Sequence, residues 1–350
     1  MESDIEKIRT EIQKQNASWE AGDTEILRLP EDQKRRRLGM KIDEEILSKT
    51  LSRERPDIVK LMAKVKGLKP SDIFSEKSFK MIKDWIQTPG VGETVDWRNR
   101  NGQSYVTEIR DQHNCGSCVS FATIATLESM IQIERGVTAD LSEAELFFCG
   151  GGTCEEGWYP DYGDGTGSIP YLINNGVSRE NCFPYPNTLG GNDLPCDTCS
   201  DRDPTFVTNE VVISDIYQRK EYIRNIGPMI GGFDVYDDFN AYKGGIYSHV
   251  TGPYIAGHAV EVIGYEEEPT GLLRCWICKN SWGKNPNWWG DGTGFFRIKY
   301  NDCRITRFPF WGISGTLPEL SANLRPYNEW KRVFKWDMVQ QLINELRADE

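Results

Sequence analysis

The sequence contains no hydrophobic run long enough to cross a membrane. A bilayer-spanning helix needs about 20 predominantly apolar residues, and no stretch of that length is continuously apolar. We therefore expect no membrane-spanning segment. The first residues, 1–6, also lack an apolar signal region. Two interpretations remain: an intracellular protein, or a protein whose signal peptide is not in this sequence.

Basic residues are fewer than acidic residues in this sequence. The formal net charge is −12 and no basic stripe offsets it, so a nucleic-acid partner is not expected. The charge is unevenly divided. Residues 1–90 hold 19 Lys and Arg against 17 Asp and Glu, a net of +2, and the rest of the chain holds 22 against 36, a net of −14. The composition thus indicates two parts of opposite sign.

Histidine is scarce, but cysteine is not. The chain has 3 histidines and 10 cysteines, and intracellular chains rarely keep so many cysteines in loop-rich regions. We therefore expect an extracytoplasmic protein, either secreted or lysosome-like or vacuole-like, rather than a cytoplasmic one. No internal repeat is visible, and 38% hydrophobic residues with 11 Trp are enough for a packed core.

The N-terminal part, residues 1–90, is predicted to be helical. Apolar residues recur at helical spacing at Ile5, Ile8 and Ile12, and again over residues 58–65. The basic run 34–37 is typical of a solvated helix face, and residues 89–92 are typical of a linker.

The remainder indicates an α+β fold. Residues 118–134 predict a helix, and Ser142 with Glu145 forms the capping-box pattern of another. Strand-like runs occupy 210–216, 259–265, 272–279 and 294–300. An apolar stripe near the C-terminus, between Val339 and Leu346, predicts a final helix.

Three residues form a constellation for nucleophilic catalysis. His258 lies 140 residues after Cys118, and Asn280 lies 162 residues after it, which is close to the order and spacing of a Cys–His–Asn site. The start of a helix favours a thiolate at Cys118. His258 can take the thiol proton, and the Asn280 side chain can orient the imidazole.

Two further groups complete the expected chemistry. Attack on a carbonyl develops an oxyanion that needs preset donors, and the Gln112 side-chain amide and the Cys118 N–H can supply them. Trp282 can cover the His258–Asn280 contact and exclude water.

These motifs resemble the papain family of cysteine peptidases over about residues 95–311. The resemblance rests on residues 95–98, 112–118, 141–146, 183–185, 242–246, 257–260 and 279–283. It implies a two-lobe catalytic domain over 91–312. The helical lobe would span about 110–205 and the antiparallel β-barrel-like lobe about 206–312. Residues 313–350 would be an extension ending in a helix.

The N-terminal motifs over 17–23 and 37–39 resemble the short propeptide of cathepsin B-like enzymes. The resemblance implies that residues 1–90 form a helical inhibitory prosegment that runs through the cleft. The histidine pair of the cathepsin B occluding loop is missing between Tyr162 and Tyr185, so carboxydipeptidase activity is not implied.

The resemblance also implies a substrate cleft. Its residues would be Gly157, Trp158, Tyr159, Pro160, Gly257 and Trp282. The pocket near Trp158 would prefer an apolar or aromatic side chain two residues before the scissile bond. Val119 and Gly257 depart from the family, which usually has an aromatic and often an aspartate at these positions.

The family's disulfide pattern implies a Cys115–Cys154 bridge and a bridge from Cys149 to Cys196 or, alternatively, to Cys182. We take the pairing with Cys196. Cys303 lacks the partner that the family supplies between 242 and 258. A split zinc site made of the pairs 196/199 and 275/278 is disfavoured by its long gap and by the strand geometry of the second pair.

We thus expect the proenzyme of a cysteine endopeptidase that acts on peptide or protein substrates without a cofactor or metal. An acyl or peptidyl transferase would use the same Cys118, His258 and Asn280. A non-enzymatic binding protein on the same scaffold is the third interpretation, although the intact triad disfavours it.

Overall fold

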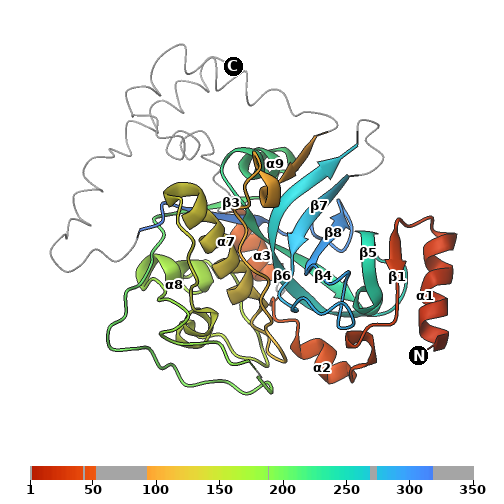
Figure 1. The fold of residues 1–350 in the computed structure, drawn as a ribbon, viewed down its shortest axis with the longest axis horizontal. Coiled ribbons are helices and arrows are strands. Elements are labelled where there is room, and N and C mark those ends of the chain that lie inside the picture. The colour runs from red at the N-terminus through yellow and green to blue at the C-terminus, as the bar shows by residue number, and fades with distance from the viewer. Residues whose placement is uncertain (1, 42–43, 53–92, 188, 269–273, 318–350) are drawn as a thin grey trace, which may run out of the picture.

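The structure, a computed structural model, describes residues 2–41, 44–52, 93–187, 189–268 and 274–317. Figure 1 shows two sides, with the helices α7 and α8 on one and a twisted sheet on the other. The elements α1, β1 and α2 of the N-terminal part lie along the sheet side and below the junction. The predicted α+β fold, with a helical side packed against a β side, is confirmed.

Helix α7 (Cys118–Arg135) is the centre of the helical side. Its residues are buried from Cys118 through Ile131, which identifies it as a core helix packed on β6, β4 and β9. It ends at Gly136, which has φ 68° and whose N–H donates to the Gln132 carbonyl at 3.0 Å. The predicted helix over 118–134 is confirmed to within one residue.

The second predicted helix is a short π-helical turn, η3 (Glu145–Cys149), followed by α8 (Ser168–Asn174). The capping box is only half formed. The Glu145 N–H donates to Ser142 Oγ at 2.9 Å, but the Glu145 carboxylate accepts instead from the Ser178 N–H and from Arg202. A tertiary ion pair therefore replaces the local contact.

The sheet has nine strands in the order β1-β5-β8-β7-β6-β4-β9-β3, with β2 added beside β6. The strands are β1 (Trp19–Ala21), β2 (Thr94–Asp96), β3 (Asn209–Ile213), β4 (Met229–Tyr236), β5 (Tyr242–Tyr247), β6 (Tyr254–Glu267), β7 (Arg274–Lys279), β8 (Phe295–Lys299) and β9 (Phe310–Ser314). The pairings are antiparallel, as expected, except that β5 and β8 pair in parallel.

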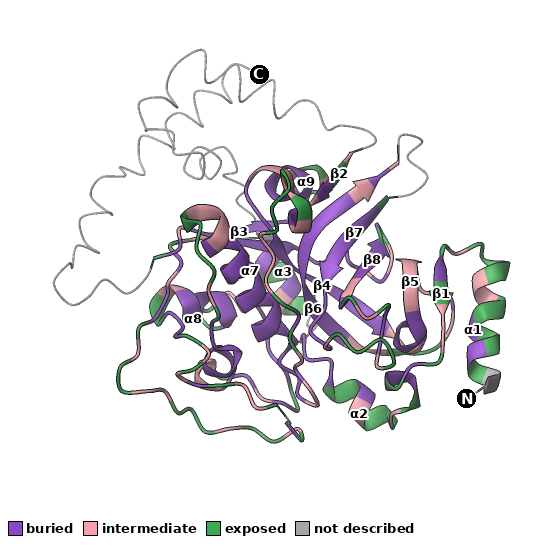
Figure 2. Ribbon diagram, in the orientation of Figure 1, coloured by how far each residue is buried: buried purple, intermediate pink, exposed green. Residues whose placement is uncertain are grey.

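The four predicted strands correspond to β3, β6, β7 and β8. The helix α9 (Ile216–Asn225) was not predicted; the side chain of its N-cap residue, Asp215, accepts the Gln218 N–H at 2.9 Å. The strands β4, β5 and β9 were not predicted either. Strand β4 (Figure 2) and strand β9 carry buried residues on both faces, so they lack the alternating pattern that marks a half-buried strand. Strand β5 is fully buried only at its two ends, Tyr242 and Tyr247.

The N-terminal part contains α1 (Glu2–Lys14), η1 (Ile26–Arg28), α2 (Glu31–Arg36) and α3 (Glu44–Ser52) besides β1. The predicted helix at the start is confirmed, since Ile5 and Ile8 are buried on one side of α1. Strand β1 extends the sheet by pairing with β5, and its Trp19 packs edge-on against Tyr247 at 5.2 Å.

The expectation of a solvated basic face over 34–37 is wrong for two of its residues. Arg35 and Arg36 are exposed, but Lys34 and Arg37 are buried. The Lys34 ammonium donates to Asp237 at 2.9 Å and to Glu31 at 2.8 Å, and these contacts compensate its burial.

Three predictions lie outside the described residues: the stripe over 58–65, the linker at 89–92 and the C-terminal helix at 339–346. Within the described ranges, none of the helices combines the length and the apolar character that a bilayer crossing requires.

Candidate active site

Cys118 is the first residue of α7 and its side chain is fully buried. Its Sγ accepts a hydrogen bond from the Ala259 N–H at 3.4 Å and another from the Gly39 N–H at 3.3 Å. Ala259 follows His258 on β6, so these contacts place the sulfur beside the predicted base. They also bring residues 37–41, called the covering segment below, onto the sulfur.

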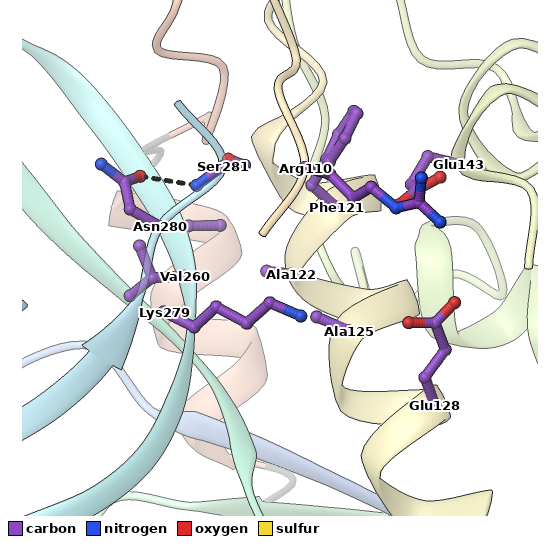
Figure 3. Close-up of a pocket in the computed structure, with 11 residues that line it drawn as sticks. Arg110, Phe121, Ala122, Ala125, Glu128, Glu143, Val260, Lys279, Asn280 and Ser281 are labelled. Atoms are coloured by element: carbon purple, nitrogen blue, oxygen red, sulfur yellow. Dashed lines mark hydrogen bonds between the residues drawn. The ribbon is translucent and has the colours of Figure 1, made fainter. Parts of the chain in front are cut away.

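His258 and Asn280 meet because of the register between β6 and β7. Glu261 lies opposite Lys279, so Asn280 falls two positions from the residue opposite His258, and both side chains leave the same face. The His258 Nε2 lies 2.8 Å from Asn280 Oδ1. Because Oδ1 also accepts the Ser281 N–H at 2.9 Å (Figure 3), Nε2 is the donor and the neutral ring keeps its lone pair on Nδ1.

Trp282 stacks over the imidazole, as expected from the sequence. The two ring centroids are 5.1 Å apart at 35°, and Phe233 contacts the imidazole at 5.7 Å. Both aromatic rings exclude water from the His258–Asn280 contact, which strengthens that hydrogen bond.

Gln112 holds a peptide carbonyl. Its Nε2 donates to the Arg37 carbonyl at 3.0 Å and to the Cys115 carbonyl at 2.8 Å. The Ser281 hydroxyl donates to Gln112 Oε1 at 2.6 Å and so fixes which end of the amide is the donor. The predicted oxyanion donor therefore already binds a carbonyl oxygen, supplied by the covering segment.

Two glycines allow this segment to cross the sulfur. A Cβ at Gly39 would lie 1.8 Å from the Gly116 carbonyl oxygen, and a Cβ at Gly157 would lie 1.9 Å from the Gly39 carbonyl oxygen. Gly157 also has φ +73°, which other residues rarely adopt. Neither position has room for a side chain.

The remaining cleft residues contribute mainly through their backbone. The Trp158 N–H donates to the Gly39 carbonyl at 2.7 Å, and the Gly257 carbonyl accepts the Met40 N–H at 3.1 Å. The Trp158 ring does not serve as expected, because it packs on Phe147 inside the helical side. Tyr159 and Pro160 are buried, and Tyr159 meets Trp311 edge-on at 5.3 Å.

Gly232, which contacts the apolar side chain of Met40, was not among the predicted site residues. The Met40 side chain is buried, and a Cβ at Gly232 of β4 would lie 2.2 Å from the Met40 sulfur. The pair Gly231-Gly232 inside an apolar run was the available signal, because glycine within a strand marks close approach of another group.

Burial keeps the central pair neutral while the segment is in place. It raises the pKa of the Cys118 thiol to about 11, although the hydrogen bonds from the Ala259 and Gly39 N–H groups act to lower that pKa. It also lowers the pKa of His258 to about 4, against the hydrogen bond with Asn280. The expected stabilised thiolate is therefore wrong for the covered site, where desolvation outweighs the helix start.

A small cavity behind Asn280 is lined by charged residues. Figure 3 shows Lys279 reaching from β7 toward α7, on which Glu128 lies. The Lys279 ammonium is 3.9 Å from Glu261 and 3.0 Å from the Thr107 hydroxyl. Burial raises the pKa of Glu128 to about 7 and raises that of Glu143 well above its usual range.

Three disulfides lie in the described part of the chain, Cys115–Cys154, Cys149–Cys196 and Cys182–Cys199. The first two are the pairings that we took from the resemblance, and the third was not foreseen. The first ties the loop before Cys118 to the loop before Gly157. Cys303 is buried and unpaired.

The two other histidines, His249 and His113, have different surroundings. The Nδ1 of His249 lies 3.1 Å from Asp238, and its ring stacks on Tyr236 with the ring centroids 3.8 Å apart. His113 has φ 52°, and its Nδ1 is 3.7 Å from the Asp111 carboxylate.

Comparisons with known proteins agree with this geometry. The family described as "Papain family cysteine protease" matches residues 91–313. Fruit bromelain of Ananas comosus is 32% identical over 218 residues, which cover 61% of this chain and 57% of bromelain. The cathepsin B-like CP2 of Giardia intestinalis is 30% identical over 274 residues, covering 73% of this chain and 81% of that protein.

A solved structure, proCathepsin B S9 from Trypanosoma congolense, superposes with a TM-score of 0.68 at 23% identity. It covers 91% of this chain and 99% of its own, so the shared fold includes the N-terminal part. The chain spans little more than half of bromelain's length but most of the Giardia protein's. With the family match over the whole predicted catalytic part, these likenesses establish that the chain belongs to the papain family of cysteine proteases.

Proposed function

We propose that the chain is the precursor of a cysteine endopeptidase acting on peptide or protein substrates. Cys118 is the nucleophile, His258 the general base and then acid, Asn280 the orienting group and Gln112 the oxyanion donor. The observation that carries the proposal is that Gln112 holds a peptide carbonyl at 3.0 Å beside Cys118, while His258 is already oriented by Asn280 at 2.8 Å.

The proposed chemistry needs no group beyond the chain and water. The lone pair on His258 Nδ1 takes the thiol proton, and the sulfur bonds to the substrate carbonyl carbon while Gln112 and the Cys118 N–H stabilise the oxyanion. His258 then gives its proton to the leaving amine, and a thioester remains. Water, deprotonated by His258, hydrolyses the thioester and restores the thiol.

We propose that residues 1–90 are an inhibitory prosegment and that its covering segment blocks the cleft. Met40 pairs in parallel with Trp158, and the group that meets the sulfur is the Gly39 N–H at 3.3 Å. A cleavable peptide must instead present a carbonyl carbon to the sulfur. The segment therefore occupies the site without being a substrate in this orientation.

Charge complementarity supports the same role. The body carries the carboxylates of Asp237 and Glu156, which pair with Lys34 at 2.9 Å and with Lys41 at 3.0 Å. Because one member of each pair is a carboxylate, acid weakens the attraction, and salt screens it. We propose that mildly acidic conditions release the prosegment.

We propose an apolar preference for the substrate residue two positions before the scissile bond. The buried Met40 side chain against Gly232 and the Gly257 backbone supports it. Glu156, already paired with Lys41, and its neighbour Glu155 add a secondary preference for basic residues nearby.

The three disulfides fit an oxidising location outside the cytoplasm. We propose more specifically that the protein is secreted or resides in a lysosome-like or vacuole-like compartment.

The test uses the full chain and its Cys118→Ala variant. After incubation at mildly acidic pH, the wild type should lose its N-terminal part, react with an epoxide thiol inhibitor and cleave a protein substrate. The variant should lose several orders of magnitude in turnover while remaining folded by circular dichroism. Activity of the variant within about tenfold of wild type would exclude Cys118 as nucleophile. Amide products in place of acids, when an amine is added, would favour a peptidyl transferase.

A further inference from the structure

Arg37 of the covering segment occupies a separate pocket. Its side chain is 5% exposed, although arginine is almost never buried unless paired. Its carbonyl oxygen accepts a hydrogen bond from Gln112 Nε2 at 3.0 Å. Farther along the segment, the Met40 N–H donates to the Gly257 carbonyl and the Lys41 N–H donates to the Trp158 carbonyl. Arg37 is therefore on the other side of the sulfur from the Met40 pocket, the side that a leaving group would occupy.

Two side chains of the catalytic part surround the guanidinium. Its centre lies 4.4 Å from the centroid of the Trp288 ring, a cation–π distance. Its Nη1 lies 3.6 Å from the Asp111 carboxylate. Burial lowers the pKa of Arg37, and the Asp111 carboxylate opposes that shift by favouring the charged guanidinium. The pocket therefore offers a flat aromatic face and a negative charge, which together suit a cationic side chain.

The Asp111 carboxylate, which carries the negative charge of this pocket, is held rigidly near the reacting carbonyl. Asp111 directly precedes Gln112, its Oδ1 accepts the His113 N–H at 2.8 Å, and its backbone bridges to Trp282. These groups belong to residues 111–288 and remain when the covering segment leaves. Arg37 itself makes incomplete use of them, because its Nε and Nη1 find no hydrogen-bond partner in the described part of the chain.

We propose that Asp111 and Trp288 form a subsite that selects an arginine or lysine side chain of the substrate, just after the scissile bond. The proposal rests on the proposed peptidase function and adds to it a basic preference on the leaving-group side. A neutral side chain of similar length would keep contact with Trp288 but lose the attraction of Asp111, and a glutamate would be repelled.

The experiment uses enzyme activated from the full chain and fluorescence-quenched peptides with identical residues before the scissile bond. The first or second residue after the bond is Arg, Met or Glu. At low salt, Arg should exceed Met in kcat/KM by about tenfold at one of the two positions, and Glu should fall below Met. The Arg-to-Met ratio should shrink as NaCl is raised.

Variants locate the effect. Asp111→Asn and Trp288→Ala should each lower the Arg-to-Met ratio at least threefold. Glu108→Gln removes an exposed carboxylate three residues before Asp111 that pairs with Lys284, and it should leave the ratio unchanged. The salt series on unmodified enzyme keeps the test decisive if a variant does not fold.

A ratio near one at both positions, with the Met peptides cleaved efficiently, would overturn this subsite and leave the peptidase function standing. No cleavage of any peptide after activation would instead count against the proposed function itself.

Discussion

The covered state of Cys118 and His258 determines how reactive the thiol is. Both groups are neutral near pH 7, because burial raises the pKa of Cys118 to about 11 and lowers the pKa of His258 to about 4. Removing the covering segment readmits water and ends the desolvation that favours the neutral forms. The same two side chains should then form a thiolate–imidazolium pair.

Alkylation of Cys118 by iodoacetamide should report this change, since the thiolate is the reacting form. Between pH 6 and 7 we expect the intact chain to react at least about a hundredfold more slowly than the activated enzyme. The intact chain should accelerate steadily toward alkaline pH, whereas the activated enzyme should react at a nearly constant rate from pH 5 to 8. Mass spectrometry of the Cys118 peptide gives the rate. Coincident pH profiles would contradict the neutral pair.

At this scale, sequence spacing predicts the central residues, and their catalytic roles stay predictions. Cys118, His258, Asn280 and Gln112 each stand in a local motif, and the structure brings them together. Gly232 and Met40 could not be paired in the same way, because their contact depends on where two segments far apart in the chain cross. No local pattern encodes that crossing.

Among the elements, α2 and the residues after it depart most from sequence expectation. A run of four basic residues is normally solvated, yet Lys34 and Arg37 are buried against Asp237, Asp111 and Trp288. The acidic body supplies the partners, so the outcome depends on tertiary contacts and not on the run itself. The charge division between the two parts was the only sequence signal for this attraction.

The Gly39→Ala substitution should disable the covering segment. Its Cβ would lie 1.8 Å from the Gly116 carbonyl oxygen, and the backbone on both sides cannot move away cheaply. The full-length variant should cleave a peptide at pH 7 without acid treatment, at least about tenfold faster than the wild-type precursor. Asp32→Ala, an exposed change on α2, serves as the control and should stay latent. Equal latency of both variants would show that residues 37–41 do not restrain the enzyme.

The whole molecule combines an acidic composition with several buried carboxyl groups. Burial raises the pKa of both Glu128 and Glu180 to about 7 from the ordinary 4.5. Through these two groups the folded chain binds more protons than the unfolded chain between pH 4.5 and 7, and they outnumber His258, whose lowered pKa acts in the opposite direction. Raising the pH through this window consequently lowers the free energy of unfolding.

We expect the melting temperature of the Cys118→Ala protein, which cannot digest itself, to fall by roughly 5 °C between pH 5 and pH 7.5. Glu128→Gln imitates the protonated side chain and should flatten that dependence. Scanning calorimetry at one heating rate measures both. A protein more stable at pH 7.5 than at pH 5 would contradict the burial of these groups in the folded state.

The sheet was the part of the molecule that the sequence predicted least. Strands β4 and β9 are buried on both faces, and β5 pairs in parallel with a strand far along the chain. Such pairings depend on long-range contacts. The sequence of Met229–Tyr236 does not alternate between apolar and polar residues, so it lacks the pattern by which a strand is predicted. The overall two-sided arrangement was predictable only through the family resemblance.

The N–H of Gly39 at the sulfur has a consequence for the kinetic order of activation. In the covered state the sulfur meets the Gly39 N–H, while Gln112 holds the carbonyl of Arg37, so we expect a molecule to cut its own covering segment slowly. The first cuts should come from another molecule whose segment has already left. Activation should therefore be autocatalytic and second order in protein, with a lag that shortens as the concentration rises and disappears when a trace of activated enzyme is added.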